Sequence, residues 1–393
     1  MRMNPNHTLR APRTRQGFSL VELMVGVAVG LIGLLVVFKT LAVWDSHTRT
    51  TTAGGDAQMS GTIAMFSLER DIRLAGMGLG LAAPTVMGCS VTGTDTVGGR
   101  ALTFPFFPVQ IVANAVAGAP DQINVLAGNS PFFATAQSFT TSSATTKKLD
   151  RRYGFRKGDV VVVAGNATAT PSSADCRLVQ ITDTADPDGF TVSHASGTFT
   201  ADVAYAASAG ASSAVSQFNA GGGTGTTFTS GTMYNLGPQP ELNRWSTDGR
   251  VLSRLEYLHS ATALGVSDGV INLKAEYGVD VNGDNIIADD NTEWTSATPT
   301  DWTRVRAIRV ALLVRSSQFE KAQGTSAAPV PVTPTNPTWT RGDGTTASFL
   351  MTNIDGSADS GASDTSPNNW RFYRYTVYEK VVPLRNMIWG TSP

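Results

Sequence analysis

The chain has 393 residues, of which 41% are hydrophobic and 16% are charged, and its formal net charge is −1. This length allows one large domain or two smaller ones beside any membrane segment. The balanced charge argues against a nucleic-acid partner, because nucleic-acid-binding domains carry an excess of basic residues. No HExxH, GxSxG or Walker A pattern is present, and the isolated Ser253, His259 and Asp268 have no informative spacing. We therefore expect no enzyme activity and no small-molecule substrate.

An apolar stretch near the N-terminus is the most distinctive feature. Arginines occupy positions 2, 10, 13 and 15, and residues 18–38 follow as an almost wholly apolar run in which Glu22 is the only charge. At 1.5 Å per residue, a helix of this length is about sufficient to cross a hydrocarbon core of ~30 Å. The basic side should stay in the cytoplasm and direct the remaining chain outward. We expect a single-pass inner-membrane protein with a cytoplasmic N-terminus.

Residues 17–25, GFSLVELMV, resemble the class III signal of type IV prepilins and pseudopilins. The resemblance implies that a prepilin peptidase and methyltransferase cuts after Gly17 and methylates the new N-terminal Phe18, and that Glu22 is the assembly carboxylate. An amine on Phe18 lies one helical turn from Glu22 and can pair with a neighbouring subunit's carboxylate. An ordinary secretory signal would need a small-residue cleavage site after the apolar run. A plain signal anchor would not explain Gly-Phe followed by Glu at this spacing.

Helical periodicity returns after the apolar run. Met59, Ile63, Phe66 and Ile72 share one stripe, which we expect to be buried, and the glycine-rich residues 76–80 should end the helix. We therefore divide this part of the chain into a cytoplasmic leader, 1–17, a transmembrane and fibre-core helix, 18–43, and an amphipathic continuation of that helix, 44–79.

Residues 80–393 are expected to form a periplasmic or extracellular β-rich domain. Low-complexity segments near 201–231 and 324–345 are expected to be loops. Two alternating segments predict strands with one buried face. Runs that favour strands occur at 122–127, 158–164, 176–182, 190–193, 305–315 and 371–382. The predicted fold class is α+β, a long N-terminal transmembrane and assembly helix packed on a β-rich, pilin-like globular domain with large loops.

Several segments resemble PilW-type minor pilins. Residues 68–76 match the pattern LxxDIRxAG, residues 158–163 read GDVVVV, and Leu384–Asn386 gives an LRN ending. The resemblance implies a minor pilin of the type IV pilus that assembles with other minor and major pilins, in a tip or priming complex, and reaches the cell surface. Alternatives are a minor pseudopilin of a type II secretion system and an uncut, membrane-anchored adhesion or binding module.

The two cysteines, Cys89 and Cys176, fall on the exported side of the predicted topology. Disulfides form and persist in that environment, and an even pair suggests one bridge. Two separate buried thiols are the alternative.

A loop at residues 280–291 offers oxygen ligands at spacings similar to those of an EF-hand, so calcium is the one cofactor considered. Its position 6 is asparagine instead of glycine, and the bidentate glutamate at position 12 is absent. An acidic hairpin turn is the competing interpretation, because Asn-Gly-Asp-Asn favours turns. The candidate ligands are Asp280, Asn282, Asp284, Ile286 and Asp289.

Overall fold

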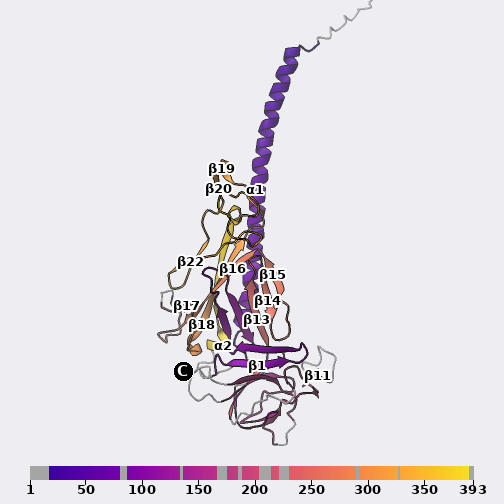
Figure 1. The fold of residues 1–393 in the computed structure, drawn as a ribbon, viewed down its shortest axis with the longest axis vertical. Helices are drawn as coiled ribbons and strands as arrows, with labels where there is room; N and C mark the ends of the chain where they lie inside the picture. The colour runs from indigo at the N-terminus through magenta and orange to yellow at the C-terminus, as the bar shows by residue number, and fades with distance from the viewer. Residues whose placement is uncertain are drawn as a thin grey trace, which may run out of the picture. The chain divides into compact units, whose positions relative to one another are not determined.

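The computed structural model describes residues 17–79, 86–132, 136–165, 175–184, 188–202, 214–220, 230–288, 292–325 and 328–388. The chain divides into two compact units, Met1–Ala53 and Gly54–Pro393. The predicted fold class is confirmed, since an apolar N-terminal helix is combined with a large β-rich body (Figure 1).

Helix α1 spans Leu20–Leu74 without a break and contributes to both units. It stops where the glycine-rich segment begins, because Gly76 has a φ of 80° that residues with a Cβ rarely adopt. The Gly76 N–H donates to the Leu126 carbonyl at 3.0 Å, which fixes the direction in which the chain leaves the helix.

The largest sheet of the second unit has eight strands in the order β2-β1-β8-β7-β12-β5-β6-β9. Its strands are β1 (Ser90–Asp95), β2 (Arg100–Pro105), β5 (Gln137–Ser142), β6 (Thr146–Leu149), β7 (Val160–Gly165), β8 (Cys176–Gln180), β9 (Thr191–Ser193) and β12 (Gly231–Gly237). Strand β1 joins β8 through a parallel pairing of only two residue pairs.

A five-stranded sheet has the order β15-β14-β13-β4-β3, and a four-stranded sheet has the order β17-β16-β18-β23. The five strands are β3 (Val109–Val112), β4 (Gln122–Ala127), β13 (Glu241–Thr247), β14 (Val251–Glu256) and β15 (Leu264–Asp268). The four strands are β16 (Val270–Val279), β17 (Trp294–Thr295), β18 (Val305–Arg315) and β23 (Tyr375–Pro383).

Short elements complete the described part of the chain. Three two-stranded pairs join β10 (Thr198–Phe199) to β11 (Ala214–Val215), β19 (Gln323–Thr325) to β20 (Ala328–Val330), and β21 (Thr338–Thr340) to β22 (Thr346–Ser348). Two 3-10 helices, η2 (Trp302–Arg304) and η3 (Trp370–Phe372), and a terminal helix α2 (Arg385–Ile388) are also present. The segment expected to be a loop near 324–345 therefore contains short hairpins, which its threonine and valine residues favour. Much of 201–231 lies outside the described residues.

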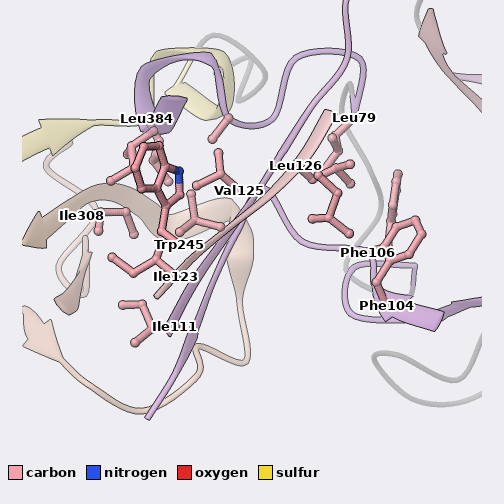
Figure 2. Close-up of a cluster of buried hydrophobic side chains, with 14 of the residues drawn as sticks. Leu79, Phe104, Phe106, Ile111, Ile123, Val125, Leu126, Trp245, Ile308 and Leu384 are labelled. Atoms are coloured by element: carbon pink, nitrogen blue, oxygen red, sulfur yellow. The ribbon is translucent and has the colours of Figure 1, made fainter. Parts of the chain in front are cut away.

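One hydrophobic cluster draws residues from α1 and all three large sheets. Figure 2 shows part of it, with Ile123 and Trp245 from the five-stranded sheet beside Ile308 from the four-stranded sheet and Leu384 near the end of the chain. Two smaller clusters lie on the other faces of β7 and β18. The valines of β7 therefore alternate between two cores, which explains a continuous apolar run where a half-exposed strand would alternate with polar residues.

Three details differ from the sequence-based expectation. Strand β18 is buried on both faces, because Ala311 and Leu313 pack in a separate cluster opposite Ile308. Phe372 belongs to η3 instead of a strand, and Val381, expected to be buried, is 46% exposed. Strand β23 serves two cores, because Tyr375 and Val377 pack against the cluster of Trp370 while Val382, on the opposite face, belongs to the main cluster.

Candidate assembly surfaces and the end of the long helix

The apolar half of α1 presents its side chains to the surroundings. The segment Leu20–Asp45 has 26 residues and a mean hydropathy of 2.7, long enough and apolar enough to cross a membrane, and no part of its most apolar window is buried within the chain. Gly17, Phe18 and Ser19 precede the helix and are exposed. Glu22 lies in the first turn, where the positive end of the helix dipole favours a carboxylate. The leader residues 1–16 lie outside the described residues.

The second half of α1 has two apolar faces. The face toward the body is lined by Ala64, Leu68 and Ile72, all fully buried. The stripe expected to be buried is wrong in three of its four members, because Met59, Ile63 and Phe66 are 68%, 47% and 66% exposed. Small residues explain which face turns inward. A Cβ at Gly61 would lie 2.3 Å from the Tyr378 ring, so this face alone allows the helix to approach β23 closely.

Asp71, in the LxxDIRxAG segment, is a buried charge at the helix–sheet contact. Its Oδ2 accepts hydrogen bonds from Asn243 Nδ2 at 3.0 Å and from Trp245 Nε1 at 3.1 Å, both on β13. Arg254 and Arg70 lie within 3.9 and 3.7 Å of the carboxylate. Burial raises the pKa of Asp71 above its ordinary value, and Arg254 opposes this shift. The hydrogen bonds of this carboxylate thus fix the position of α1 on the five-stranded sheet.

The LRN segment meets the end of the same helix. Asn386 Nδ2 donates to the carbonyl oxygens of Leu74 and Ala75 at 3.2 and 3.0 Å, which satisfies two of the acceptors that a helix C-terminus leaves open. Leu384 is fully buried in the main cluster, and Met387 packs against Gly76. The two segments that suggested PilW from opposite ends of the sequence therefore lie in contact.

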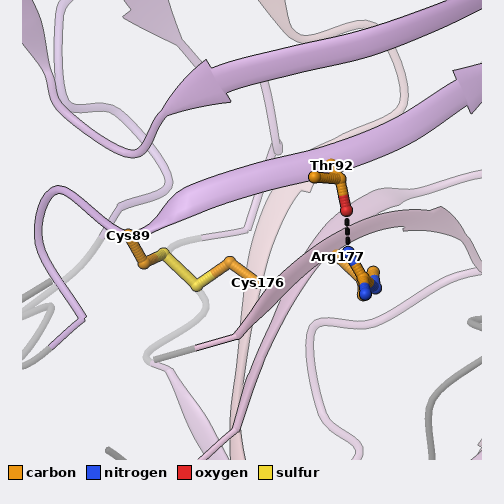
Figure 3. Close-up of a disulfide and its surroundings, with 4 residues drawn as sticks. All are labelled: Cys89, Thr92, Cys176 and Arg177. Carbon is orange, nitrogen blue, oxygen red and sulfur yellow. Dashed lines mark hydrogen bonds between the residues drawn. A yellow bond between two sulfur atoms is a disulfide. The ribbon is translucent and has the colours of Figure 1, made fainter. Parts of the chain in front are cut away.

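The structure joins Cys89 and Cys176 in a disulfide, with Cα atoms 6.1 Å apart (Figure 3). The bond lies beside the short parallel pairing of β1 with β8, where Arg177 also donates a hydrogen bond to Thr92 Oγ1. The disulfide links the β1–β2 hairpin covalently to the rest of the eight-stranded sheet, at a point where few backbone hydrogen bonds join the two parts.

The loop proposed for calcium is organised as a turn in its described part. Asp280 Oδ1 and Oδ2 accept from the backbone N–H groups of Gly283 and Asn285, and Arg306 lies 3.7 Å from Oδ2. Asp284 accepts from Asn282 Nδ2 and from the Ile286 N–H. Asp289 lies outside the described residues. A carboxylate already engaged by an arginine and two backbone donors fits the acidic-turn interpretation better than a cation ligand.

Ser253, His259 and Asp268 share no side-chain hydrogen bond in the described part of the chain. His259 Nδ1 contacts Glu256 Oε2 at 2.9 Å, and the imidazole ring packs edge-on against Phe218. Ser253 lies within β14, paired with β15. Sequence reasoning missed Asn243, Trp245 and Asn386 as partners, because none is recognisable until the sheets bring them to α1.

Comparison with known proteins gives two family matches. Residues 232–386 match the model of type IV pilus-assembly protein W, and residues 12–38 match the prokaryotic N-terminal methylation motif. No curated protein and no solved structure matches the chain. The first match covers β13, β23 and the LRN segment, and the second covers Gly17, Phe18 and Glu22. With the apolar helix and the β-rich body, these matches support a PilW-like type IV minor pilin.

Proposed function

We propose that this pilin is cut between Gly17 and Phe18 by prepilin peptidase, is methylated on Phe18, and is incorporated as a low-abundance subunit in an initiating or tip complex of the pilus. The observation that carries the proposal is the apolar segment of α1, a 26-residue helix whose surface the chain itself leaves uncovered, with one carboxylate in its first turn. Such a surface is stable in lipid before assembly and against other apolar helices afterwards.

Glu22 is the proposed assembly residue. Cleavage after Gly17 would create an amine four residues before Glu22, and a carboxylate among apolar helices is costly unless it meets a cation. The methylated Phe18 amine of a neighbouring subunit supplies that cation. Pairing across subunits also sets the axial offset between adjacent helices, because the two charges occupy fixed places in each.

The exposed stripe of Met59, Ile63 and Phe66 is the proposed second contact surface. Its members are spaced by four and three residues and therefore lie on one side of α1. Large apolar side chains gathered in this way on a helix are typical of a surface that another protein covers. Neighbouring pilins are the partners that the family implies.

The first experiment determines the mature N-terminus by mass spectrometry in cells with and without the prepilin peptidase. We expect an N-methylated Phe18 only when the peptidase is present. An intact leader in both strains, or cleavage beyond residue 42, would contradict the proposal and favour an anchored binding module.

The second experiment compares Glu22→Ala with Glu22→Asp, which keeps the charge. We expect the alanine variant to lose surface pili and the aspartate variant to retain part of them. Loss of protein secretion with normal piliation would assign the chain to a type II secretion system instead. Quantitative mass spectrometry of sheared pili should find far fewer copies of this chain than of the major pilin, and comparable amounts would contradict a tip or priming role.

A further inference from the structure

A cleft of about 520 Å³ opens beside the eight-stranded sheet. Its residues precede the family-matched segment 232–386, so the family match assigns it no role. Three exposed or half-exposed aromatic rings line it, with Tyr153 89% exposed. Its arginines and rings are Arg151, Arg152, Arg156, Phe132, Tyr153 and Phe190.

The cleft carries excess positive charge. Its one described carboxylate, Asp188, pairs with Lys148 Nζ at 2.8 Å and also accepts from the N–H groups of Phe190 and Thr191. None of the three arginines forms an ion pair with a carboxylate in the described part of the chain. Asp159 lies close enough to Arg156 for their charges to interact, and the remaining guanidinium charge is available to an anion.

Two of these arginines are arranged as in a binding site. A buried nitrogen of Arg152, Nη1, has no hydrogen-bond acceptor among the described residues. An unsatisfied charged donor is costly, and an anion that entered the cleft would recover this cost once the Arg152 side chain turned toward it. The Arg156 guanidinium stacks over the Phe132 ring, 4.0 Å from its centroid, which presents a flat cationic surface.

The loop that carries the arginines is held in place by the sheet. Phe155 is buried in the hydrophobic cluster behind it, and the Gly154 carbonyl accepts from Asn235 Nδ2 at 2.7 Å. The Arg156 N–H donates to Asp159 Oδ2 at 2.9 Å, and this oxygen also accepts from Asn235. The arginines are thus preorganised, which lowers the entropy lost when a ligand binds.

We propose that this cleft binds single-stranded nucleic acid without sequence specificity, with phosphates on the arginines and bases stacked on Tyr153 and Phe190. Proteins that bind single strands combine a positive groove with aromatic stacking platforms. An acidic polysaccharide would also satisfy the charges and could stack through its C–H groups, whereas a base offers a flat π face to each ring; the test below separates these two ligands. The net charge of −1 suggested no such partner, because it averages over the chain and conceals a local cluster.

The test uses the full-length chain in detergent micelles and a fluorescein-labelled oligothymidylate, with binding followed by anisotropy over a series of salt concentrations. Three phosphate contacts predict a slope of about −2 for log K against log salt, since each contributes about −0.7 on a single strand. Arg151→Gln should reduce the magnitude of the slope by about 0.7. Arg250→Gln, which removes an exposed arginine in the turn between β13 and β14, should leave the slope unchanged.

Tyr153 provides the decisive variant, because its ring is so exposed that its removal leaves folding intact. Tyr153→Ala should weaken binding by roughly five- to a hundredfold with the salt slope unchanged, and Tyr153→Phe should bind as the parent does. Two results would overturn the proposal. The first is that the oligonucleotide does not bind at low salt. The second is that dextran sulphate displaces it as effectively as unlabelled oligonucleotide does and that Tyr153→Ala has no effect. The second result would assign the cleft to general polyanion binding.

Discussion

Replacing Asp71 with alanine tests whether the buried carboxylate holds α1 on the five-stranded sheet. The change leaves Trp245 Nε1, on a side chain only 1% exposed, without its described acceptor, whereas Asn243 keeps a second bond to Glu241. An orphaned buried donor costs about 1–3 kcal/mol. The ion pairs to Arg254 and Arg70 are half-exposed at their cationic ends and add about 0–1 kcal/mol. Loss of the desolvated charge offsets part of this, so we expect a net destabilisation of about 2–3 kcal/mol.

The assay is thermal denaturation followed by near-ultraviolet circular dichroism. At ~2.1 cal/mol/K per residue, the unfolding entropy of a unit the size of Gly54–Pro393 is about 0.7 kcal/mol/K, so the midpoint should fall by about 3–4 °C. Arg70→Gln, which removes an exposed partner of the same carboxylate, should shift it by less than about 1 °C. Trp245→Phe removes the indole donor and completes a double-mutant cycle with Asp71→Ala. If the two losses add within ~0.5 kcal/mol, the proposed coupling is refuted.

The same variant predicts a pH dependence. Burial raises the pKa of the Asp71 carboxyl in the folded chain above the value of 3.8 that it has in the unfolded chain. At a pH between these two pKa values, the folded chain holds more of a proton on Asp71 than the unfolded chain does. The contribution of this group to stability is therefore greatest below 3.8 and declines as the pH rises through that window. The stability difference between the parent chain and Asp71→Ala should shrink as the pH is raised from about 4 to 7. A difference that grows with pH would show that the carboxylate is stabilised in its ionised form.

The remaining predictions concern three other sites. Asn386→Ala should lower the unfolding free energy by about 0.5–1.5 kcal/mol by exposing the carbonyls of α1, as measured by urea denaturation, and an unchanged midpoint would contradict the cap. Replacing Cys89 and Cys176 with serine opens a loop with a sequence separation of 87 and should cost about 4–5 kcal/mol in the chain-entropy model; equal stability of the parent with and without reductant would argue against this. Burial and the neighbouring Lys147 charge lower the pKa of His194 to about 3, so its imidazole stays neutral and the folded chain loses stability as the pH falls below 6.5. His194→Gln should remove about 2 kcal/mol of the loss measured between pH 7 and 5, and identical pH profiles would refute this.

Short-range sequence patterns predicted where the helix and strands lie better than they predicted which face of each is buried. The strand bounds at β4 and β18 coincide with the alternating or apolar runs that indicated them, because aliphatic residues dominate both. The helix face was wrong at Met59, Ile63 and Phe66 because periodicity places residues on a common side without telling which side is covered. Gly61 determines which face is buried, because any larger residue at this position would collide with a strand that lies far along the chain.

The candidate sites also differ in how far the sequence alone could predict them. Gly17, Phe18 and Glu22 belong to a contiguous motif that matches the N-terminal methylation model, and so the sequence alone could single them out. The partners of Asp71 are assembled by pairing between distant strands, and no local signal marks them. The arginines of the cleft lie together in the segment RRYGFR at 151–156, which the balanced charge of the whole chain conceals. The net charge of the chain sums over all residues and therefore does not show that three arginines line one cleft together with three aromatic rings.

The contact between Asn386 and the end of α1 spans 312 residues of sequence and has a consequence for biogenesis. The ribosome makes the helix early and the residue that closes it 312 residues later. The β-rich body can therefore reach its final form only after Asn386 has been synthesised. A chain that ends before Leu384 keeps its long apolar helix but lacks both the cap and a fully buried core side chain. Completion of the body thus reports that synthesis has passed residue 386, and truncated chains differ from longer ones in their failure to close the core.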